Sequence, residues 1–175
     1  MPRNAGYSLT ELLVVLALAA LLLGLAVPAF TNLVLDARLV AAVNRLVHGI
    51  HVARHEALKT GADVVLCRSR TGRQCTETGD FTQGLIVFVN RDRDDPPRVD
   101  AGETVLQAEP AFGLAMLSAN RRTFVFRPFS RSVNGTFTAC DRRGDRAARA
   151  VVVSYTGRPR AVPVAEADGA RSCPG

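Results

Sequence analysis

Residues 6–30 read GYSLTELLVVLALAALLLGLAVPAF, a stretch in which Glu11 is the only charged residue. The apolar run from Leu12 to Phe30 has nineteen residues, and at about 1.5 Å rise per residue it reaches roughly 28 Å as a helix. Because the hydrocarbon core of a bilayer is about 30 Å thick, this run predicts a membrane-spanning helix. An ordinary secretory signal has a shorter apolar core of about 7 to 15 residues, although Gly24-Leu25-Ala26 imitates its cleavage site.

Glu11 separates this span from an ordinary anchor. A carboxylate at the centre of a membrane helix costs about 2.5 to 3.5 kcal/mol, so one kept at the head of a span is expected to have a partner. The only cation near it in the sequence is Arg3. If the chain is cut between Gly6 and Tyr7, however, Tyr7 presents a free amine that can pair with the Glu11 of a neighbouring subunit. This arrangement predicts a filament subunit.

These residues resemble the type IV pilin signature, which has a short polar leader ending in Gly, an aromatic first mature residue, a Glu at the fifth mature position and a long apolar helix containing Pro28. The resemblance implies that a prepilin peptidase removes the leader, Met1–Gly6, and N-methylates Tyr7, while Glu11 acts in assembly. It also implies a single-pass protein of the bacterial inner membrane with a periplasmic C-terminal part, which enters a pilus or pseudopilus on assembly.

After the span, the chain is long enough for one domain. Of its 175 residues, 145 follow residue 30, enough to bury a core but not to form two domains. Residues 31–60 continue as a helix, which Gly61 ends. One narrow face of this helix is apolar at three- and four-residue spacing, through Leu39, Val43, Leu46, Ile50, Ala53 and Ala57.

Beyond Gly61, the pattern predicts strands. Short β-branched runs, separated by turn signals such as Asn134-Gly135 and Thr156-Gly157, predict antiparallel strands at 62–67, 85–90, 123–127, 136–140 and 150–155. We expect a meander laid on the helix, in a pilin-like α+β fold whose long N-terminal transmembrane and amphipathic helix packs on antiparallel β-sheets. The expected division is a leader (1–6), a transmembrane or filament-core helix (7–30), its amphipathic half (31–60) and a β-rich globular part (61–175).

Four cysteines follow the predicted span, and none belongs to a Cys-x-x-Cys pair. In an oxidising exterior they are expected to form two disulfides. Four cysteines allow three pairings, of which we favour Cys67–Cys75, closing a loop around Thr71-Gly72, and Cys140–Cys173, pinning the C-terminal tail to a strand. Structural zinc sites use closer cysteine pairs, so we expect no metal or other cofactor.

Three histidines, His48, His51 and His55, lie on the helix face opposite the apolar stripe. Their spacing could hold a metal ion, but solvated polar residues are the default there, and no carboxylate at the right offset completes a zinc triad. We therefore expect a solvated or subunit-facing surface.

The segment 91–102 is rich in Asp, Arg and Pro and is expected to be an exposed connection. Asn90, Asp92 and Asp94 alternate like the first ligands of a calcium loop. Asp95, however, stands where that loop needs glycine, and Ala101 stands where it needs glutamate. The simpler interpretation is a loop whose charges compensate one another.

Motifs of catalytic sites are missing from the sequence: it has no G-x-S-x-G elbow, no Gly-rich phosphate loop and no H-E-x-x-H helix. We expect that the protein is not an enzyme.

Positive charge is concentrated at the C-terminal end. Residues 119–175 contain eleven arginines and four acidic residues, whereas residues 1–118 contain eleven basic and twelve acidic ones. Nearly all the basic residues are arginines, whose planar guanidinium pairs bidentately with phosphate, although a G+C-rich genome also favours Arg codons. Arg158 and Arg160 flank Pro159, and a preceding turn is crowded by Arg142, Arg143, Arg146 and Arg149. This surface suits a polyanion.

Several segments resemble the FimT/GspH group of minor pilins and pseudopilins, and the similarity runs along nearly the whole chain. They are ARHEA at 53–57, VVLC at 64–67, GLIVF at 84–88, VVVS at 151–154 and GRPR at 157–160. The resemblance implies a two-sheet β domain packed on the helix, and a tip complex in which the subunit contacts other minor and major pilins. In the FimT branch, a Gly-Arg-x-Arg motif in the tail contacts DNA during uptake by natural transformation, and Gly157, Arg158 and Arg160 match this motif.

We therefore expect a FimT-like minor pilin of a type IV pilus that binds double-stranded DNA through Gly157, Arg158 and Arg160, with Arg142, Arg143, Arg146 and Arg149 as support. Pro159 lacks a backbone donor, so the two guanidinium groups must make the contact. No aromatic ladder accompanies them in the sequence, which argues against a platform for single strands. The alternative is a GspH-like minor pseudopilin of a type II secretion system, in which the arginines serve solubility and pair with acidic neighbours.

Overall fold

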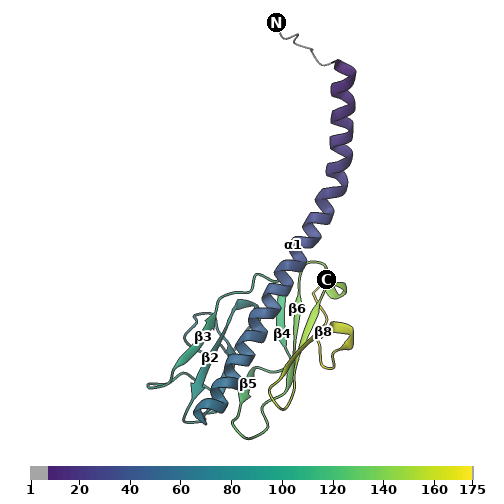
Figure 1. Ribbon diagram of the computed structural model, residues 1–175. Helices are drawn as coiled ribbons and strands as arrows, with labels where there is room; N and C mark the ends of the chain where they lie inside the picture. Colours follow the sequence, from purple (N-terminus) through teal and green to yellow (C-terminus); the bar gives the residue numbers. More distant parts are fainter. Residues whose placement is uncertain (1–7, 175) are drawn as a thin grey trace. The chain divides into compact units, whose positions relative to one another are not determined.

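The computed structural model describes residues 8–174, so the expected cleavage and methylation positions, Gly6 and Tyr7, lie outside the described residues. The first element is a long helix, α1 (Leu9–Thr60). The chain forms two compact units, one ending at Ala37 and the other beginning at Arg38 (Figure 1). The boundary falls within α1, so each unit contains one part of this helix.

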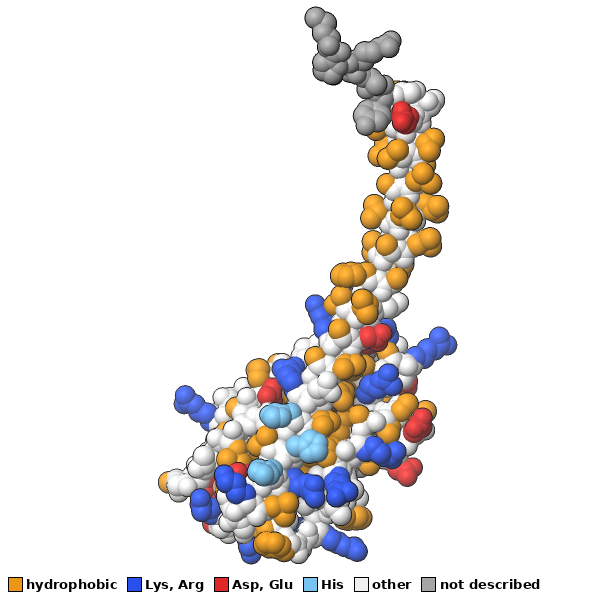
Figure 2. Space-filling model, in the orientation of Figure 1, with side chains coloured by type: hydrophobic (Ala, Val, Ile, Leu, Met, Phe, Trp, Pro, Cys, Tyr) orange, Lys and Arg blue, Asp and Glu red, His pale blue; other side chains and the backbone are white. Residues whose placement is uncertain are grey.

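In the first unit, α1 carries apolar side chains all round. Its large apolar residues between Leu9 and Leu33 are exposed, and Figure 2 shows them covering this half of the helix. Glu11 lies in the first turn, where a negative charge interacts favourably with the helix dipole. Within residues 8–174, α1 is the one helix long and apolar enough to cross a membrane, judged by length and composition. An apolar surface on every side is typical of a helix surrounded by lipid or by other helices.

In the second unit, α1 buries one face. All six residues of the predicted apolar stripe are buried, together with Ala42 and Gly49. Gly61 adopts φ +69°, and its N–H donates to the carbonyl of Ala57 over 3.1 Å. This is the left-handed cap that ends a helix, as the sequence predicts.

The β strands form two four-stranded sheets whose neighbouring strands are all antiparallel. Sheet A has the order β3-β2-β1-β5, and its strands are β1 (Asp63–Arg68), β2 (Leu85–Asn90), β3 (Val105–Glu109) and β5 (Thr123–Phe126). Sheet B has the order β4-β6-β7-β8, and its strands are β4 (Met116–Ala119), β6 (Gly135–Cys140), β7 (Arg149–Val153) and β8 (Pro159–Pro163). Short 3-10 helices lie at Phe81–Gln83, Gly144–Arg146 and Val164–Glu166.

One core joins α1 to both sheets. Figure 1 shows the α1 ribbon of the second unit lying against the sheets. Phe124 of β5 and Phe137 of β6 stack with ring centroids 4.4 Å apart, so the two sheets meet at this pair. Phe81 packs edge-on against Phe137 with centroids 5.0 Å apart. The fold class expected from the sequence, a long helix packed on antiparallel sheets, is confirmed.

The expected meander is wrong. The five predicted strands are present, but β1, β2 and β5 belong to sheet A whereas β6 and β7 belong to sheet B. Asn134-Gly135 closes no hairpin, because Gly135 begins β6 and the preceding strand lies in the other sheet. Turn signals report local backbone preference, whereas burial of Phe124 against Phe137 decides where the chain changes sheet.

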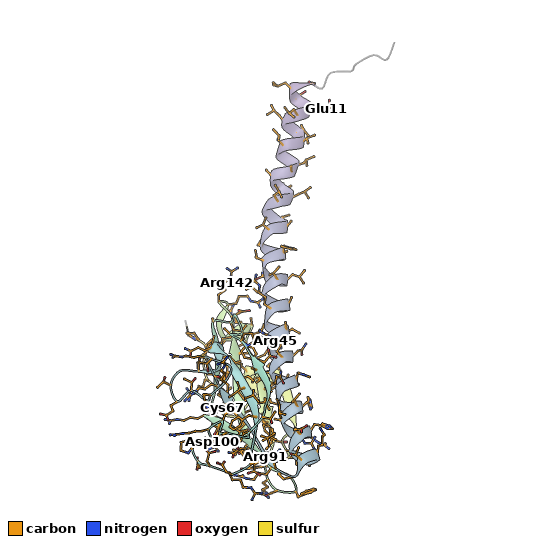
Figure 3. The ribbon with its side chains drawn as sticks, turned by 90° about the vertical axis from the view of Figure 1, so that its left-hand side faces the viewer. Glu11, Arg45, Cys67, Arg91, Asp100 and Arg142 are labelled. Carbon is orange, nitrogen blue, oxygen red and sulfur yellow. A yellow bond between two sulfur atoms is a disulfide. The ribbon has the colours of Figure 1, made fainter. Side chains whose placement is uncertain are left out.

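Two disulfides tie loops to the outer faces of the sheets. They are Cys67–Cys75, with 5.6 Å between Cα atoms, and Cys140–Cys173, with 5.8 Å, which is the pairing that the sequence favours. Figure 3 shows Cys67 and Asp100 on the side of the sheets away from α1. There a second apolar cluster includes Cys67 and Phe88 and is covered by Cys75 and Val99.

Candidate nucleic-acid interface

Gly157 shapes the turn between β7 and β8. Its N–H donates to the carbonyl of Ser154 over 2.8 Å, and the N–H of Ser154 donates to the carbonyl of Arg158 over 3.1 Å. Gly157 has φ +71°, and a Cβ here would lie 3.0 Å from a ring carbon of Phe126 and 3.4 Å from Cδ of Arg54. Only glycine meets both requirements without strain, so the first residue of the motif fixes the position of Arg158, from which the chain enters β8 at Pro159.

Arg158 and Arg160 are exposed at the edge of sheet B. Arg160 lies in β8 opposite Val152, and Arg158 precedes the strand by one residue. Since they are two residues apart in extended chain, both lie on the same face. Within residues 8–174, neither guanidinium has an ion pair or a hydrogen-bond acceptor, so both are available to a ligand.

The edge strand is protected against pairing with another strand. β8 begins with Pro159 and ends with Pro163, neither of which has an N–H to donate. The arginine between them is therefore presented on an edge that does not favour strand addition.

The tail after β8 is fixed to the outer face of sheet B. Thr136 Oγ1 donates to the carbonyl of Asp168 over 2.8 Å, and the N–H of Arg171 donates to Thr138 Oγ1 over 2.9 Å. The Cys140–Cys173 disulfide closes the covering. Because β8 continues directly into this tail, Arg158 and Arg160 lie on backbone that is held at both ends.

The arginines between β6 and β7 do not act alike. Arg143 donates to Asp141, with 2.6 Å between Nη2 and Oδ2, and this hydrogen bond holds the pKa of the buried Asp141 carboxyl below its ordinary value. Arg143 is therefore occupied. Arg142, Arg146 and Arg149 are exposed, and within the described part of the chain their guanidinium groups make no ion pair or hydrogen bond, although the charge of Arg142 also helps to lower the pKa of Asp141.

The structure does not bring this cluster to the Gly157 motif. Arg149 lies opposite Pro163 and Arg160 opposite Val152, so Arg149 and Arg158 are at opposite ends of the β7–β8 ladder. At about 3.3 Å per residue, the four residue steps of β7 separate these ends by roughly 13 Å. Figure 3 labels Arg142 at one end of the globular part. Arg142, Arg146 and Arg149 therefore form a second basic patch, separate from Arg158 and Arg160.

A cleft that the sequence analysis missed lies beside the motif, and we call it the Tyr155 cleft. It has a volume of about 530 Å³ and lies between the end of α1, β5, the β5–β6 connection and the β7–β8 turn. Arg54, Phe129, Arg131 and Tyr155 are among its lining residues. Tyr155 lies two residues before Gly157 in the same turn, and this spacing is the signal in the sequence for an aromatic ring near the motif.

The histidines are exposed on α1, and Figure 2 shows them together along the half of the helix that packs on the sheets. Among residues 8–174, the metal-ligating side chains whose ligand atoms come together within 4.8 Å are Asp92, Asp94 and Asp100. The oxygens of Asp94 already accept hydrogen bonds, from Asn90 Nδ2 over 3.0 Å and from the N–H of Arg98 over 2.9 Å. These contacts serve the loop's own structure.

Comparisons with known proteins identify the family and the fold. Residues 42–157 match the family model described as type II transport protein GspH, and residues 1–27 match the prokaryotic N-terminal methylation motif. No curated protein sequence matches the chain significantly.

Two crystal structures of the type IV minor pilin FimU from Pseudomonas aeruginosa (strain PAO1) have a similar fold. One has a TM-score of 0.54 and 19% identity, covering 76% of this chain and 98% of that one. The other has a TM-score of 0.53 and 21% identity, covering 77% of this chain and 94% of that one. At this identity, the likeness concerns the fold.

Proposed function

This chain belongs to the GspH family, and from this premise we propose that it is a FimT-like minor pilin of a type IV pilus that binds DNA through Arg158 and Arg160. Members of the family are minor pilins or pseudopilins of type IV pilus or type II secretion systems, and they are structural subunits, not known enzymes. Such subunits are processed by a prepilin peptidase and assemble with other pilins.

The N-terminal segment anchors the subunit in a membrane before assembly. In our proposal the leader 1–6 is removed, Tyr7 is N-methylated, and residues 7–30 cross the inner membrane once with the globular part in the periplasm. Glu11 then pairs with the N-terminal amine of a neighbouring subunit in the filament. The exposed apolar surface of this half of α1 supports the proposal, because exposure of so much apolar surface to water is unfavourable, whereas lipid or neighbouring helices would cover it.

One observation carries the DNA-binding proposal: Arg158 and Arg160 present two unpaired guanidinium groups on a rigid edge. The Gly157 turn holds their backbone at one end and the disulfide-bonded tail holds it at the other. Ordering a flexible segment on binding costs free energy, and a segment that is already fixed avoids that cost. Guanidinium contacts to phosphate carry no sequence information, so we expect binding that is sequence-independent and strongly salt-dependent.

The alternative function is that of a GspH-like minor pseudopilin of a type II secretion system without DNA binding. The family description itself favours this alternative. In that case the C-terminal arginines would contact acidic residues of neighbouring subunits, and substitutions at Arg158 and Arg160 would alter assembly instead of DNA affinity.

The test is fluorescence anisotropy of a labelled random-sequence duplex with the full chain in nonionic detergent. We compare the wild type with R158A/R160A and with R91A/R98A, a control that removes two exposed arginines from the loop on sheet A. We expect R158A/R160A to weaken binding by about 10- to 100-fold and the control to stay within about two-fold. Equal losses in both variants would assign the affinity to diffuse charge, and no binding by the wild type would favour the secretion alternative.

A further inference from the structure

The Tyr155 cleft has the size and position of a ligand site. Its volume of about 530 Å³ falls in the range of about 300 to 1,000 Å³ that small-molecule sites occupy. Tyr155 and Thr156 belong to the same turn as Gly157, and Arg54 approaches that turn from α1. A ligand in the cleft would therefore lie beside the chain segment that leads into Arg158.

The walls of the cleft are cationic. Arg54, Arg127 and Arg131 line it, and no acidic residue does within the described part of the chain. Arg127 is paired with Asp63, with 3.5 Å between Nε and Oδ2. Arg54, by contrast, has no ion pair within the described part of the chain. Such walls favour an anionic ligand.

The cleft also offers aromatic rings to the solvent. Phe129 is 91% exposed and adopts φ +56°, a conformation that strains a bulky residue. Tyr155 is 54% exposed, and the guanidinium of Arg131 lies 5.3 Å from its ring centroid. An exposed ring on strained backbone contributes little to the stability of the fold, so its use is better sought in binding.

Hydrogen bonds to backbone carbonyls tie together the two turns that carry these rings. The N–H of Ser132 donates to the carbonyl of Tyr155 over 2.9 Å, which ties the β5–β6 connection to the β7–β8 turn. Arg127 adds a hydrogen bond from Nη1 to the carbonyl of Arg131 over 3.4 Å. The turns that carry the rings are therefore tied together. Arg131 covers one face of Tyr155, whereas the described residues give the Phe129 ring no stacking or cation–π contact.

Resting on the proposed function, we infer that the cleft binds one unpaired nucleotide of the DNA held at Arg158 and Arg160. The base stacks on Phe129 and also contacts Tyr155, and its phosphate faces Arg54 and Arg131. Stacking on aromatic side chains tolerates any base, because every base has a π-face. The sequence shows no aromatic ladder beside the arginines, and the two rings that this inference uses come from turns far apart in the chain.

The inference predicts a preference for DNA with a single-stranded tail over the same duplex with blunt ends. The test measures the affinity of the full chain, in nonionic detergent, for both probes, the tail being a short run of thymidines. The variants are F129G and Y155A, with R158A/R160A as the tail variant and R73A as a control for loss of an exposed arginine. F129G removes the ring and also relieves the positive φ, so we expect its thermal stability to be unchanged or raised.

We expect the wild type to bind the tailed probe about ten-fold more tightly than the blunt probe, and F129G and Y155A each to lose most of that preference while keeping blunt-duplex affinity. R158A/R160A is expected to weaken binding of both probes, whereas R73A is expected to leave the affinity for both probes unchanged. Equal wild-type affinities for the two probes would overturn the nucleotide site and leave the proposed function standing. Unchanged preference in F129G and Y155A, together with impaired incorporation into filaments, would assign the cleft to a protein partner. A wild type that binds neither probe would overturn both proposals.

Discussion

Sheet A and sheet B each carry, on the face away from the core, a covering segment that a disulfide ties to a strand. On sheet A the covering includes the loop 91–103, which packs through Val99 beside Cys75. On sheet B it is the segment from Val164 to Cys173, which follows β8. The construction is the same, but the charge balance differs between the loop 91–103 on sheet A and the longer segment 141–175, which includes β7, β8 and the covering of sheet B.

On sheet A the charges compensate one another. The loop 91–103 contains three arginines and five acidic residues. Its carboxylates accept hydrogen bonds from the loop's own backbone: the N–H of Arg91 donates to Glu103 over 2.7 Å, and the N–H of Arg98 donates to Asp94 over 2.9 Å. The acidic groups thus shape the loop, and they outnumber its arginines.

On sheet B the arginines are in excess. Residues 141–175 contain seven arginines and four acidic residues. Asp141 is used by Arg143, and Asp145 accepts the N–H of Cys173 over 2.7 Å. The comparison shows that counting arginines does not locate a polyanion site. A better guide is the excess of arginines over acidic residues, after the acidic residues that already bind a partner are discounted.

The largest expected effect comes from removing the two disulfides. Cys140–Cys173 spans 33 residues and Cys67–Cys75 spans 8, so the loop-entropy model predicts losses of about 4 and about 2.5 kcal/mol for C140S/C173S and C67S/C75S. We also expect C140S/C173S alone to weaken DNA binding, because it releases the tail that holds β8. Urea unfolding and anisotropy measure the two effects. Equal loss of DNA affinity in both variants would break the comparison.

A smaller effect is expected at the turn that begins β8. G157A combines the strain of φ +71° with a Cβ 3.0 Å from Phe126, so we expect a loss of about 2 to 4 kcal/mol and weaker DNA binding. G144A is the matched control, since Gly144 has φ +73° with open space around it, and we expect about 1 kcal/mol. Thermal and urea unfolding give both values. Similar losses in the two variants would mean that packing at Gly157 contributes nothing.

The smallest expected effect concerns the Asp141–Arg143 ion pair, in which Asp141 neutralises one of the arginines of the segment 141–175. Hydrogen bonding to Arg143 lowers the pKa of Asp141 below its ordinary 3.8, so the pair contributes stability above that pH and loses it as the pH falls through the lowered pKa. We expect D141N to cost about 1 to 3 kcal/mol at neutral pH and progressively less below about pH 4. Urea unfolding across pH measures this difference. A cost that stays constant with pH would contradict the assigned cause.

Local pattern in the sequence was enough to predict α1, its buried stripe, the cap at Gly61 and five of the strands. β3, β4 and β8 were missed because a mixed pattern, a four-residue strand and two prolines each weaken the strand signal. The Gly157 motif could be found because its three residues are adjacent in the chain. The Tyr155 cleft could not, since Arg54, Phe129 and Tyr155 meet only after α1 has packed on both sheets.

The salt dependence of duplex binding tests the central claim most directly. Each phosphate neutralised on duplex DNA contributes about 0.9 to the slope of log affinity against log salt concentration. If Arg158 and Arg160 each contact one phosphate, R158A/R160A will have a slope shallower by about 1.8, while R91A/R98A will keep the wild-type slope. A wild-type slope in R158A/R160A would contradict the account.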